Sequence, residues 1–454
     1  MYKNLPPIKK GAHIEFIHFP TVQQTFLFRN WEMFTAAHLA KVIGATELQV
    51  EELAKSMGLP TQNVNNDWMK KGYITIVRQN WHLLPYEQLM ELLEWDEEYL
   101  SFILKEDDFL DHKLGNIKPD VPPIKYRPLT DKEKSQTKWI KEQINKLAKL
   151  QESPETTTPF SFEFRGPEPI IEHKKPFENA TVIDKSWGIF LEGEDKIALL
   201  HINDFIEDYN IVIGVTLNND ICDSNIILKY NNGFANTENH IIKIERSQIV
   251  IEAGGHEGIL RGLIWLLKKA YENGGAFYKP ESVNRDAKVE LRIAYSYCAI
   301  YGDYTEEMLD SSYPDSLLKS YAYSGVNGIW LQALLYKLTE FPLDPSISVG
   351  YDKRIEALNT LIKRANRFGI RIFLYLNEPR SMSQEFFIKY PHLKGETENL
   401  YSAMCTSTPE VQKYLKEGVA DLTSKLKGLG GYITITMSEN LTNCFSRMPA
   451  DKVT

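Results

Sequence analysis

The sequence predicts a multidomain protein with an N-terminal helical domain, a central α+β domain and a C-terminal parallel α/β unit. Three changes of pattern predict this order. Apolar residues recur every three or four positions up to residue 115, alternate with polar residues from residue 160, and form alternating strand-like and helix-like segments after residue 287. The predicted division is 1–118 helical, 119–158 linker, 159–286 α+β and 287–454 parallel α/β.

Composition bounds what the chain can be. With 454 residues and 43% hydrophobic content, it can bury several cores. A formal net charge of -9 disfavours nucleic acid and anionic membranes as partners. The four cysteines are far apart and lack metal-binding spacing, which predicts reduced thiols, no metal site and no cofactor. No apolar run has the length of a signal peptide core or a membrane span, so a cytoplasmic location is expected.

The first domain is predicted to consist of helix pairs. Apolar positions at residues 36–43 and 50–57, interrupted by Gly44, suggest a helix-turn-helix, and a second such unit follows from Pro85. DNA binding is one interpretation, but residues 31–115 carry 15 acidic against 7 basic side chains, which favours a packing or protein-contact module. Residues 105–110 form an acidic patch that we interpret as a solvated helix end, and residues 14–19 suggest one short strand.

A linker is predicted between the first two domains. Residues 119–128 are rich in proline, a charged amphipathic helix follows from residue 130, and a Ser/Pro/Thr cluster ends at Pro159.

The central domain is predicted to be a sheet followed by a glycine-opened helix. Alternating patterns predict strands around residues 160–164, 209–213, 240–244 and 248–252. An apolar helix opened by glycines follows over residues 253–269. Gly254, Gly255, Gly258 and Gly262 match neither a dinucleotide nor a P-loop spacing, so helix entry and close packing explain them better than phosphate binding.

This succession of strands, glycines and apolar helix resembles the small α+β domain that precedes the barrel in family 20 glycoside hydrolases, the β-hexosaminidases. The resemblance implies a (β/α) TIM barrel next. Its strands would be residues 291–297, 325–332, 369–379 and 430–440, with helices over 309–323, 355–368 and 411–426. Because Thr454 follows the fourth strand closely, the barrel is apparently truncated after strand 4. We expect a longer parent chain, the alternative being completion by a second copy, and no glycosidase turnover from residues 1–454 alone.

The resemblance also implies a site at the carboxyl ends of the strands. Glu439 takes the position of the family's general acid, whereas Ser438 replaces the orienting Asp, so N-acetylhexosamine specificity is not implied. Glu378 is the candidate second carboxylate, with helix or turn capping as its alternative, and capping by Ser438 or Asn440 is the alternative for the fourth strand end. The candidate substrate-binding residues are Arg292, Asn327, Trp330, Asn377 and Asn440.

Aromatic residues on the predicted strands could stack on a sugar or simply fill the barrel: Tyr295, Tyr297, Trp330 and Tyr375. The expected function is hydrolysis of O-glycosidic bonds in a carbohydrate. The alternatives are a non-catalytic carbohydrate- or protein-binding module and a DNA-binding regulator that acts through the N-terminal helices. The oligomeric state is not predicted.

Overall fold

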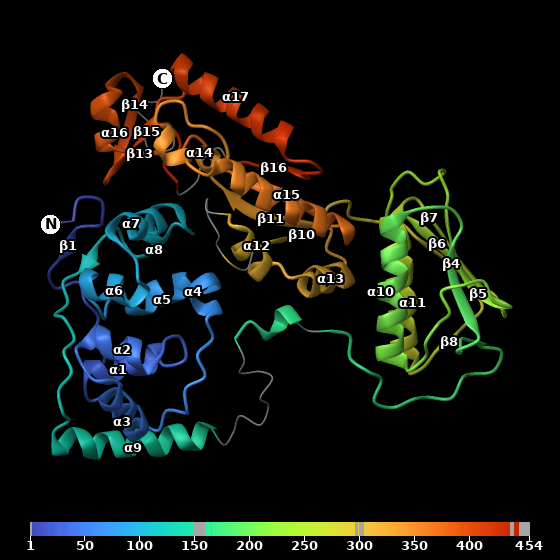
Figure 1. Ribbon diagram of the computed structural model, residues 1–454, viewed down its shortest axis with the longest axis horizontal. Coiled ribbons are helices and arrows are strands. Elements are labelled where there is room, and N and C mark those ends of the chain that lie inside the picture. Colours follow the sequence, from blue (N-terminus) through green and yellow to red (C-terminus); the bar gives the residue numbers. More distant parts are fainter. Residues whose placement is uncertain are drawn as a thin grey trace.

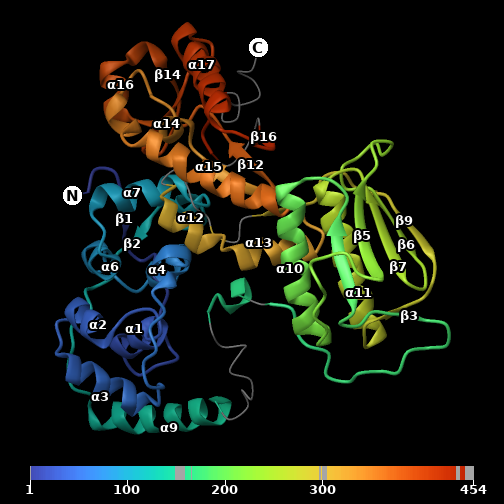
Figure 2. The ribbon, with the colours of Figure 1, turned by 45° about the vertical axis from the view of Figure 1, so that its right-hand side comes forward.

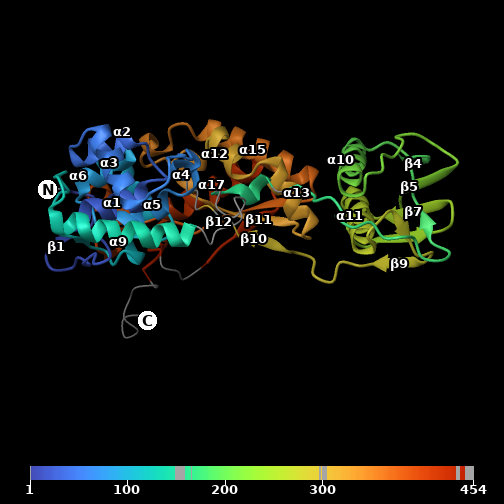
Figure 3. The same ribbon diagram turned by 90° about the horizontal axis from the view of Figure 1, so that it is seen from below.

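The protein folds into three bodies arranged in a row, as the computed structural model shows (Figure 1). The structure describes residues 2–148, 159–164, 166–295, 298, 304–435 and 440–444. The helical domain and the α+β domain lie at opposite ends, and both contact the parallel α/β unit between them, called here the sheet domain (residues 287–444). Seen from below, the row is long and flat (Figure 3). Among the described residues, no helix combines the length and apolar character needed to span a bilayer.

The helical domain contains the two predicted helix pairs. Its helices are α1 (Val22–Asn30), α2 (Ala36–Ile43), α3 (Glu47–Met57), α4 (Asp67–Lys71), α5 (Tyr73–Asn80), α6 (Tyr86–Leu93), α7 (Glu97–Glu106), α8 (Leu110–Lys113) and α9 (Asp131–Ala148). Short strands β1 (Ile8–Lys9) and β2 (Lys118–Pro119) pair in parallel. Thr46 and Gln49 form a capping box at the start of α3, and Gly44 ends α2 in the left-handed region, as the predicted helix pair requires.

The two halves of this domain repeat at a spacing of 50 residues. Asn30-Trp31 at the end of α1 corresponds to Asn80-Trp81 at the end of α5. The two buried asparagines bond to each other reciprocally, with Nδ2 to Oδ1 distances of 3.0 and 2.8 Å. Each amide also donates to a carbonyl of its own helix, at Phe26 or Ile76. A symmetric polar pair therefore joins the halves at their centre.

One expectation for the N-terminal region is wrong. Residues 14–19 form no strand, because Phe16 packs under the Arg29 guanidinium and Phe19 packs on Phe28, both on α1. The amphipathic helix predicted within the linker is present as α9, and it is packed against the helical domain. Helix α9 packs along α3, and Gln24 Nε2 donates to Thr137 Oγ1 at 2.8 Å in a buried contact. The predicted boundary at residue 158 lies outside the described residues.

The α+β domain is a five-stranded mixed sheet with two long helices on one face (Figure 2). Its sheet order is β4-β5-β7-β6-β9. The elements are β3 (Thr181–Val182), β4 (Trp187–Leu191), α10 (Lys196–Ile213), β5 (Ser224–Tyr230), β6 (His240–Ile244), β7 (Gln248–Ala253), α11 (His256–Asn273), β8 (Phe277–Tyr278) and β9 (Ser282–Arg285). The predicted strands at 240–244 and 248–252 and the glycine-opened helix are confirmed.

Two strand predictions in this part of the chain are wrong. Residues 209–213 end α10, because Asp195 caps that helix and its buried residues Ile202, Phe205 and Tyr209 recur at helical spacing. Residues 161–164 form a short 3₁₀ helix instead of a strand. There the buried Glu163 bonds to Lys71 of the helical domain at 2.5 Å, so a tertiary contact overrides the alternating pattern.

The sheet domain is built on four parallel strands in the order β10-β11-β12-β16. They are β10 (Ile293–Tyr295), β11 (Gly328–Ala333), β12 (Arg371–Leu376) and β16 (Gly431–Ile433). Three of them lie within their predicted segments, and β11 extends one residue beyond the segment predicted over 325–332. Residues 296–297 of the first predicted segment and 436–439 of the fourth lie outside the described residues. The connecting helices are α12 (Glu306–Ser312), α13 (Asp315–Tyr323), α14 (Leu335–Leu338), α15 (Tyr351–Arg367) and α17 (Pro409–Lys425). Pro314 divides the helix predicted over 309–323 into α12 and α13.

A small subdomain interrupts the connection between β12 and α17. It contains β13 (Met382–Ser383), α16 (Gln384–Lys389), β14 (Lys394–Glu398) and β15 (Tyr401–Met404). The three strands form an antiparallel sheet. The two faces of the four-stranded parallel sheet differ. Ile329, Leu331 and Leu374 are buried against the helices, while Tyr295, Trp330 and Phe373 share the other face, called here the inner face.

Candidate functional site

The candidate site lies where β11 and β12 end. After β12 the chain runs through Asn377 and Glu378 to Arg380, and after β11 it enters α14 at Leu335. Glu378 joins these two loops: its Oε1 accepts the Leu335 N–H at 2.8 Å and its Oε2 accepts the Arg380 N–H at 3.0 Å. The capping alternative considered for Glu378 therefore describes a real contact, since this carboxyl caps the start of α14.

The environment of Glu378 favours its neutral form. Burial raises its pKa to about 7, and the nearby Glu106 carboxylate acts in the same direction. The two backbone N–H donors and the Arg380 charge oppose this rise without cancelling it. A carboxyl group that titrates near neutral pH can act as a proton donor or acceptor in general acid–base chemistry.

Glu106 is the last residue of α7, a helix of the helical domain that lies beside the sheet domain (Figure 1). Its side chain reaches the candidate site. Its side chain is fully buried. Arg380 Nε donates to its Oε2 at 2.7 Å, Tyr336 OH donates to its Oε1 at 3.0 Å, and Lys105 pairs with it as well. Burial alone would raise its pKa, but Arg380 and Lys105 hold the pKa of Glu106 at about 2. Arg380 Nη2 also donates to Asn440 Oδ1 at 2.9 Å, which adds the segment after β16 to the cluster.

The two residues after Glu106 extend the acidic group. Asp107 is fully buried, accepts a hydrogen bond from Tyr73 OH and has a pKa raised by burial. Asp108 and Phe109 both adopt positive φ, at 49° and 53°, which side-chain-bearing residues seldom do. The Asp108 carboxylate pairs with Lys113 at 2.7 Å and remains partly exposed.

The prediction that residues 105–110 form a solvated helix end is therefore wrong for Glu106 and Asp107. A signal for their burial was present in the sequence. Glu106 and Asp107 follow the buried Ile103 and Leu104 by three residues, so the helical period places them on the apolar face. The 50-residue repeat pairs Asp107 with Met57, which is also fully buried.

The inner face of the sheet beside the site is aromatic and polar. The Trp330 ring lies edge-on between Tyr295 and Tyr375, with centroid distances of 4.9 and 5.0 Å. Gln332 Nε2 donates to Tyr295 OH. Within the described part of the chain, Trp330 Nε1 and Gln332 Oε1 have no hydrogen-bond partner although both atoms are buried. Buried polar atoms of this kind usually mark a place where water or a ligand binds.

The structure separates the predicted site residues into two groups. Glu378, Asn377 and Asn440 lie at the carboxyl ends of the strands, and Trp330 lies on the inner face. Glu439 and Tyr297 lie outside the described residues.

Arg292 and Asn327 lie at the opposite end, before β10 and β11. Arg292 Nη2 donates to both oxygens of Glu238 at 2.7 Å, and Asn327 Nδ2 approaches Glu238 Oε2 at 3.3 Å. Arg261 also pairs with Glu238, which lowers the pKa of that carboxyl against the effect of burial. These contacts join the α+β domain to the sheet domain, and the structure does not bring Arg292 or Asn327 near Glu378.

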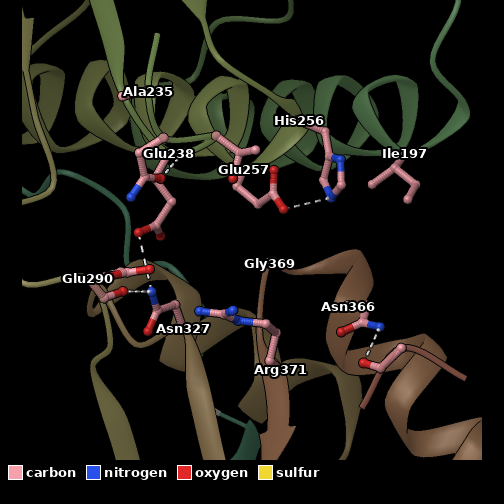
Figure 4. Close-up of a pocket in the computed structure, with 13 residues that line it drawn as sticks. Ile197, Ala235, Glu238, His256, Glu257, Glu290, Asn327, Asn366, Gly369 and Arg371 are labelled. Carbon is pink, nitrogen blue, oxygen red and sulfur yellow. Dashed lines mark hydrogen bonds and ion pairs between the residues drawn. The ribbon is translucent and has the colours of Figure 1, made fainter. Parts of the chain in front are cut away.

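A polar cavity of about 590 Å³ opens beside this second cluster (Figure 4). Its wall on the α+β side includes Glu238, His256 and Glu257, and its wall on the sheet side includes Asn327 and Arg371. In the part of the chain that the structure describes, no group of three or more His, Cys, Asp or Glu residues is arranged to hold a metal ion. The four cysteines are free thiols.

In structural terms the chain is distantly similar to glycoside hydrolases, including members of family 20, which agrees with the resemblance noted in the sequence. The sequence itself matches no protein-family model and no curated protein.

Three solved structures illustrate the similarity. A family 20 chitobiase from Flavobacterium johnsoniae aligns over 57% of this chain and 42% of its own, with 16% identity and a TM-score of 0.40. A family 20 exo-β-N-acetylglucosaminidase from Vibrio harveyi, solved with N-acetylglucosamine, aligns over 68% of this chain and 49% of its own, with 14% identity and a TM-score of 0.37. A family 138 enzyme that targets the pectin rhamnogalacturonan II aligns over 55% and 30%, with 16% identity and a TM-score of 0.42. The chain thus spans less than two thirds of each, and similarity of this size does not by itself assign an activity.

Proposed function

We propose that the protein is glycoside hydrolase-like and acts on a carbohydrate at the carboxyl ends of β10, β11, β12 and β16. The observation that carries this proposal is the buried Glu378 carboxyl at the end of a parallel strand, where burial raises its pKa to about 7. Glycoside cleavage needs a carboxylic acid that stays protonated near neutral pH and usually a second carboxylate. Sites at the carboxyl ends of strands are the rule in (β/α) barrels, and we propose that the four parallel strands belong to such a barrel.

The chemistry would be divided between two carboxyl groups. Glu439, which follows β16 in the sequence, is the proposed general acid, and Glu378 is the proposed second carboxyl group. Trp330 and Tyr375, with Tyr295 beside them, offer ring faces and edges along the inner face on which a sugar ring could pack. Ser438 stands where family 20 enzymes carry the Asp that orients an acetamido group, so the proposal does not extend to N-acetylhexosamines.

A panel of aryl glycosides tests the proposal on the whole protein. We expect Glu439→Gln to abolish turnover and Glu378→Gln to reduce it strongly. Glu385→Gln, at the exposed start of α16, is the matched control and should leave turnover unchanged. Turnover that persists at the wild-type level in Glu439→Gln would refute the assignment of the acid.

A second candidate is carbohydrate binding without cleavage. Both oxygens of Glu378 already accept backbone N–H groups, and this arrangement suits a structural carboxyl as well as a reacting one. Quenching of tryptophan fluorescence by sugars, lost in Trp330→Ala, with no turnover of any glycoside would favour this candidate. DNA binding is not proposed, because α9 packs along α3 and the end of α7 contacts the sheet domain.

A further inference from the structure

One buried carboxylate of the helical domain reaches both loops that hold Glu378. Glu106 is the last residue of α7, yet its hydrogen-bond partner Tyr336 lies in α14, which follows β11, and its partner Arg380 lies in the loop after β12. These partners are more than 200 residues away in the chain. Their side chains are buried too, Tyr336 at 7% and Arg380 at 3% exposure, so the contact is closed to bulk water.

A contact of this kind depends on its geometry. Moving a carboxylate and a guanidinium out of water is costly, and the attraction between them offsets that cost only when the remaining donors and acceptors are also satisfied. Here Tyr336 donates a hydrogen bond to one oxygen of Glu106 and Arg380 donates to the other. A further N–H of Arg380 donates to Asn440. The helical domain therefore contacts the strand ends in one defined position.

Two series of contacts link Glu106 to the two backbone N–H groups that bond to Glu378. Arg380 bonds to Glu106 through its guanidinium and to Glu378 through its own N–H. Tyr336 bonds to Glu106 through its hydroxyl, and the N–H of the residue before it, Leu335, donates to Glu378. Loss of Glu106 would release both loops at the points where they orient the carboxyl group.

We propose that Glu106 is a positioning residue of the strand-end site, so that the site is complete only when the helical domain is docked. This inference rests on the proposed role of Glu378 for its functional meaning, but its structural content does not depend on that role. It also assigns the N-terminal domain a role in the site itself, in contrast to the role of an independent interaction module.

Hydrogen exchange at two amides tests the proposal without any ligand. The Leu335 and Arg380 amides donate to Glu378, so their protection reports on the geometry of that carboxyl. We expect Glu106→Gln to accelerate hydrogen exchange at both amides about tenfold or more. Without the Glu106 carboxylate, Tyr336 and Arg380 lose a charged hydrogen-bond partner, and the Leu335 and Arg380 N–H groups are no longer held against Glu378. Exchange at Leu331 and Leu374, in the buried strands, should be unchanged.

Two further variants make the result decisive. Glu98→Gln changes an exposed carboxylate on the same helix and should leave all four amides as in the wild type. Tyr336→Phe removes only one bond to Glu106 and should accelerate exchange at Leu335 by a smaller factor, which gives a reading even if Glu106→Gln fails to fold. Unchanged protection of Leu335 and Arg380 in a folded Glu106→Gln, or of Leu335 in Tyr336→Phe, would overturn the proposal.

The result of the hydrogen-exchange test is independent of the result of the glycoside-cleavage test. Loss of protection at these amides supports the positioning role whether or not any glycoside is cleaved. A protein that cleaves glycosides with unchanged protection in the variants refutes the positioning role alone.

Discussion

Replacing Glu106 by glutamine should reveal how strongly the buried ion pair stabilises the protein. The folded protein holds the pKa of Glu106 at about 2, because Arg380 and Lys105 outweigh the effect of burial, whereas the usual value is 4.5. A group whose pKa is lowered by folding stabilises the protein fully above its unfolded pKa and loses that contribution as the pH falls toward the folded pKa. The contribution of Glu106 to stability is therefore complete above about pH 4.5 and is lost as the pH falls from 4.5 to 2.

The magnitude follows from the two pKa values. Their difference corresponds to about 3 kcal/mol of stability at pH 6, of which about 1 kcal/mol remains at pH 3. Leaving the buried Arg380 without its partner costs about 3–5 kcal/mol, which agrees in size. We therefore expect Glu106→Gln to lower the free energy of unfolding by about 3–5 kcal/mol at pH 6 and by about 2 kcal/mol less than that at pH 3.

Urea unfolding followed by tryptophan fluorescence measures this difference at the two pH values. Glu98→Gln is the control and should stay within about 0.5 kcal/mol of the wild type at both. A loss in Glu106→Gln that is the same at pH 3 and pH 6 would refute the reasoning, since an uncharged contact has no such dependence. A loss below about 1 kcal/mol at pH 6 would refute it as well.

Three other changes test contacts elsewhere. Asn80→Ala leaves the Asn30 amide without its partner in the centre of the helical domain and should lower the free energy of unfolding by about 1–3 kcal/mol in urea; an unchanged midpoint would contradict the pairing. Glu238→Gln weakens the bonds from Arg292 and should expose the segment between the α+β and sheet domains to limited proteolysis, and an unaltered digestion pattern would argue against this. Gly258→Ala places a methyl group 2.7 Å from a backbone carbonyl oxygen and should lower the free energy of unfolding, measured by thermal unfolding, by about 1–3 kcal/mol. An unchanged stability would show that α11 can shift.

Local patterns predicted part of the fold well, although they missed helix α10 and strands β4 and β5. The helices α2, α3 and α11 carry apolar residues at helical spacing with caps at their ends, and such signals act within about a dozen neighbouring residues. The parallel strands β11 and β12 were also evident, because buried strands read as short apolar runs between helix-length segments.

The failures have a common physical origin. The segment 209–213 alternates like a strand, but it continues α10, whose start at Asp195 and buried residues at helical spacing decide its conformation. Residues 161–164 also alternate, yet the buried contact of Glu163 with Lys71 holds them as a short helix. An alternating run of five residues is compatible with both structures, and the choice depends on which surface is available for packing.

The candidate site shows the same division. The sequence by itself determined that Glu378 follows a buried strand and that an acidic group ends the helix before Phe109. Only the tertiary structure decided that Glu106 leaves the solvent, pairs with Arg380 and reaches the loops around Glu378, while Arg292 and Asn327 join the α+β domain at the other end. The physical reason is that the ionisation and the role of a carboxyl group depend on its burial and on partners that lie far away in the chain, and a local pattern carries no information about either.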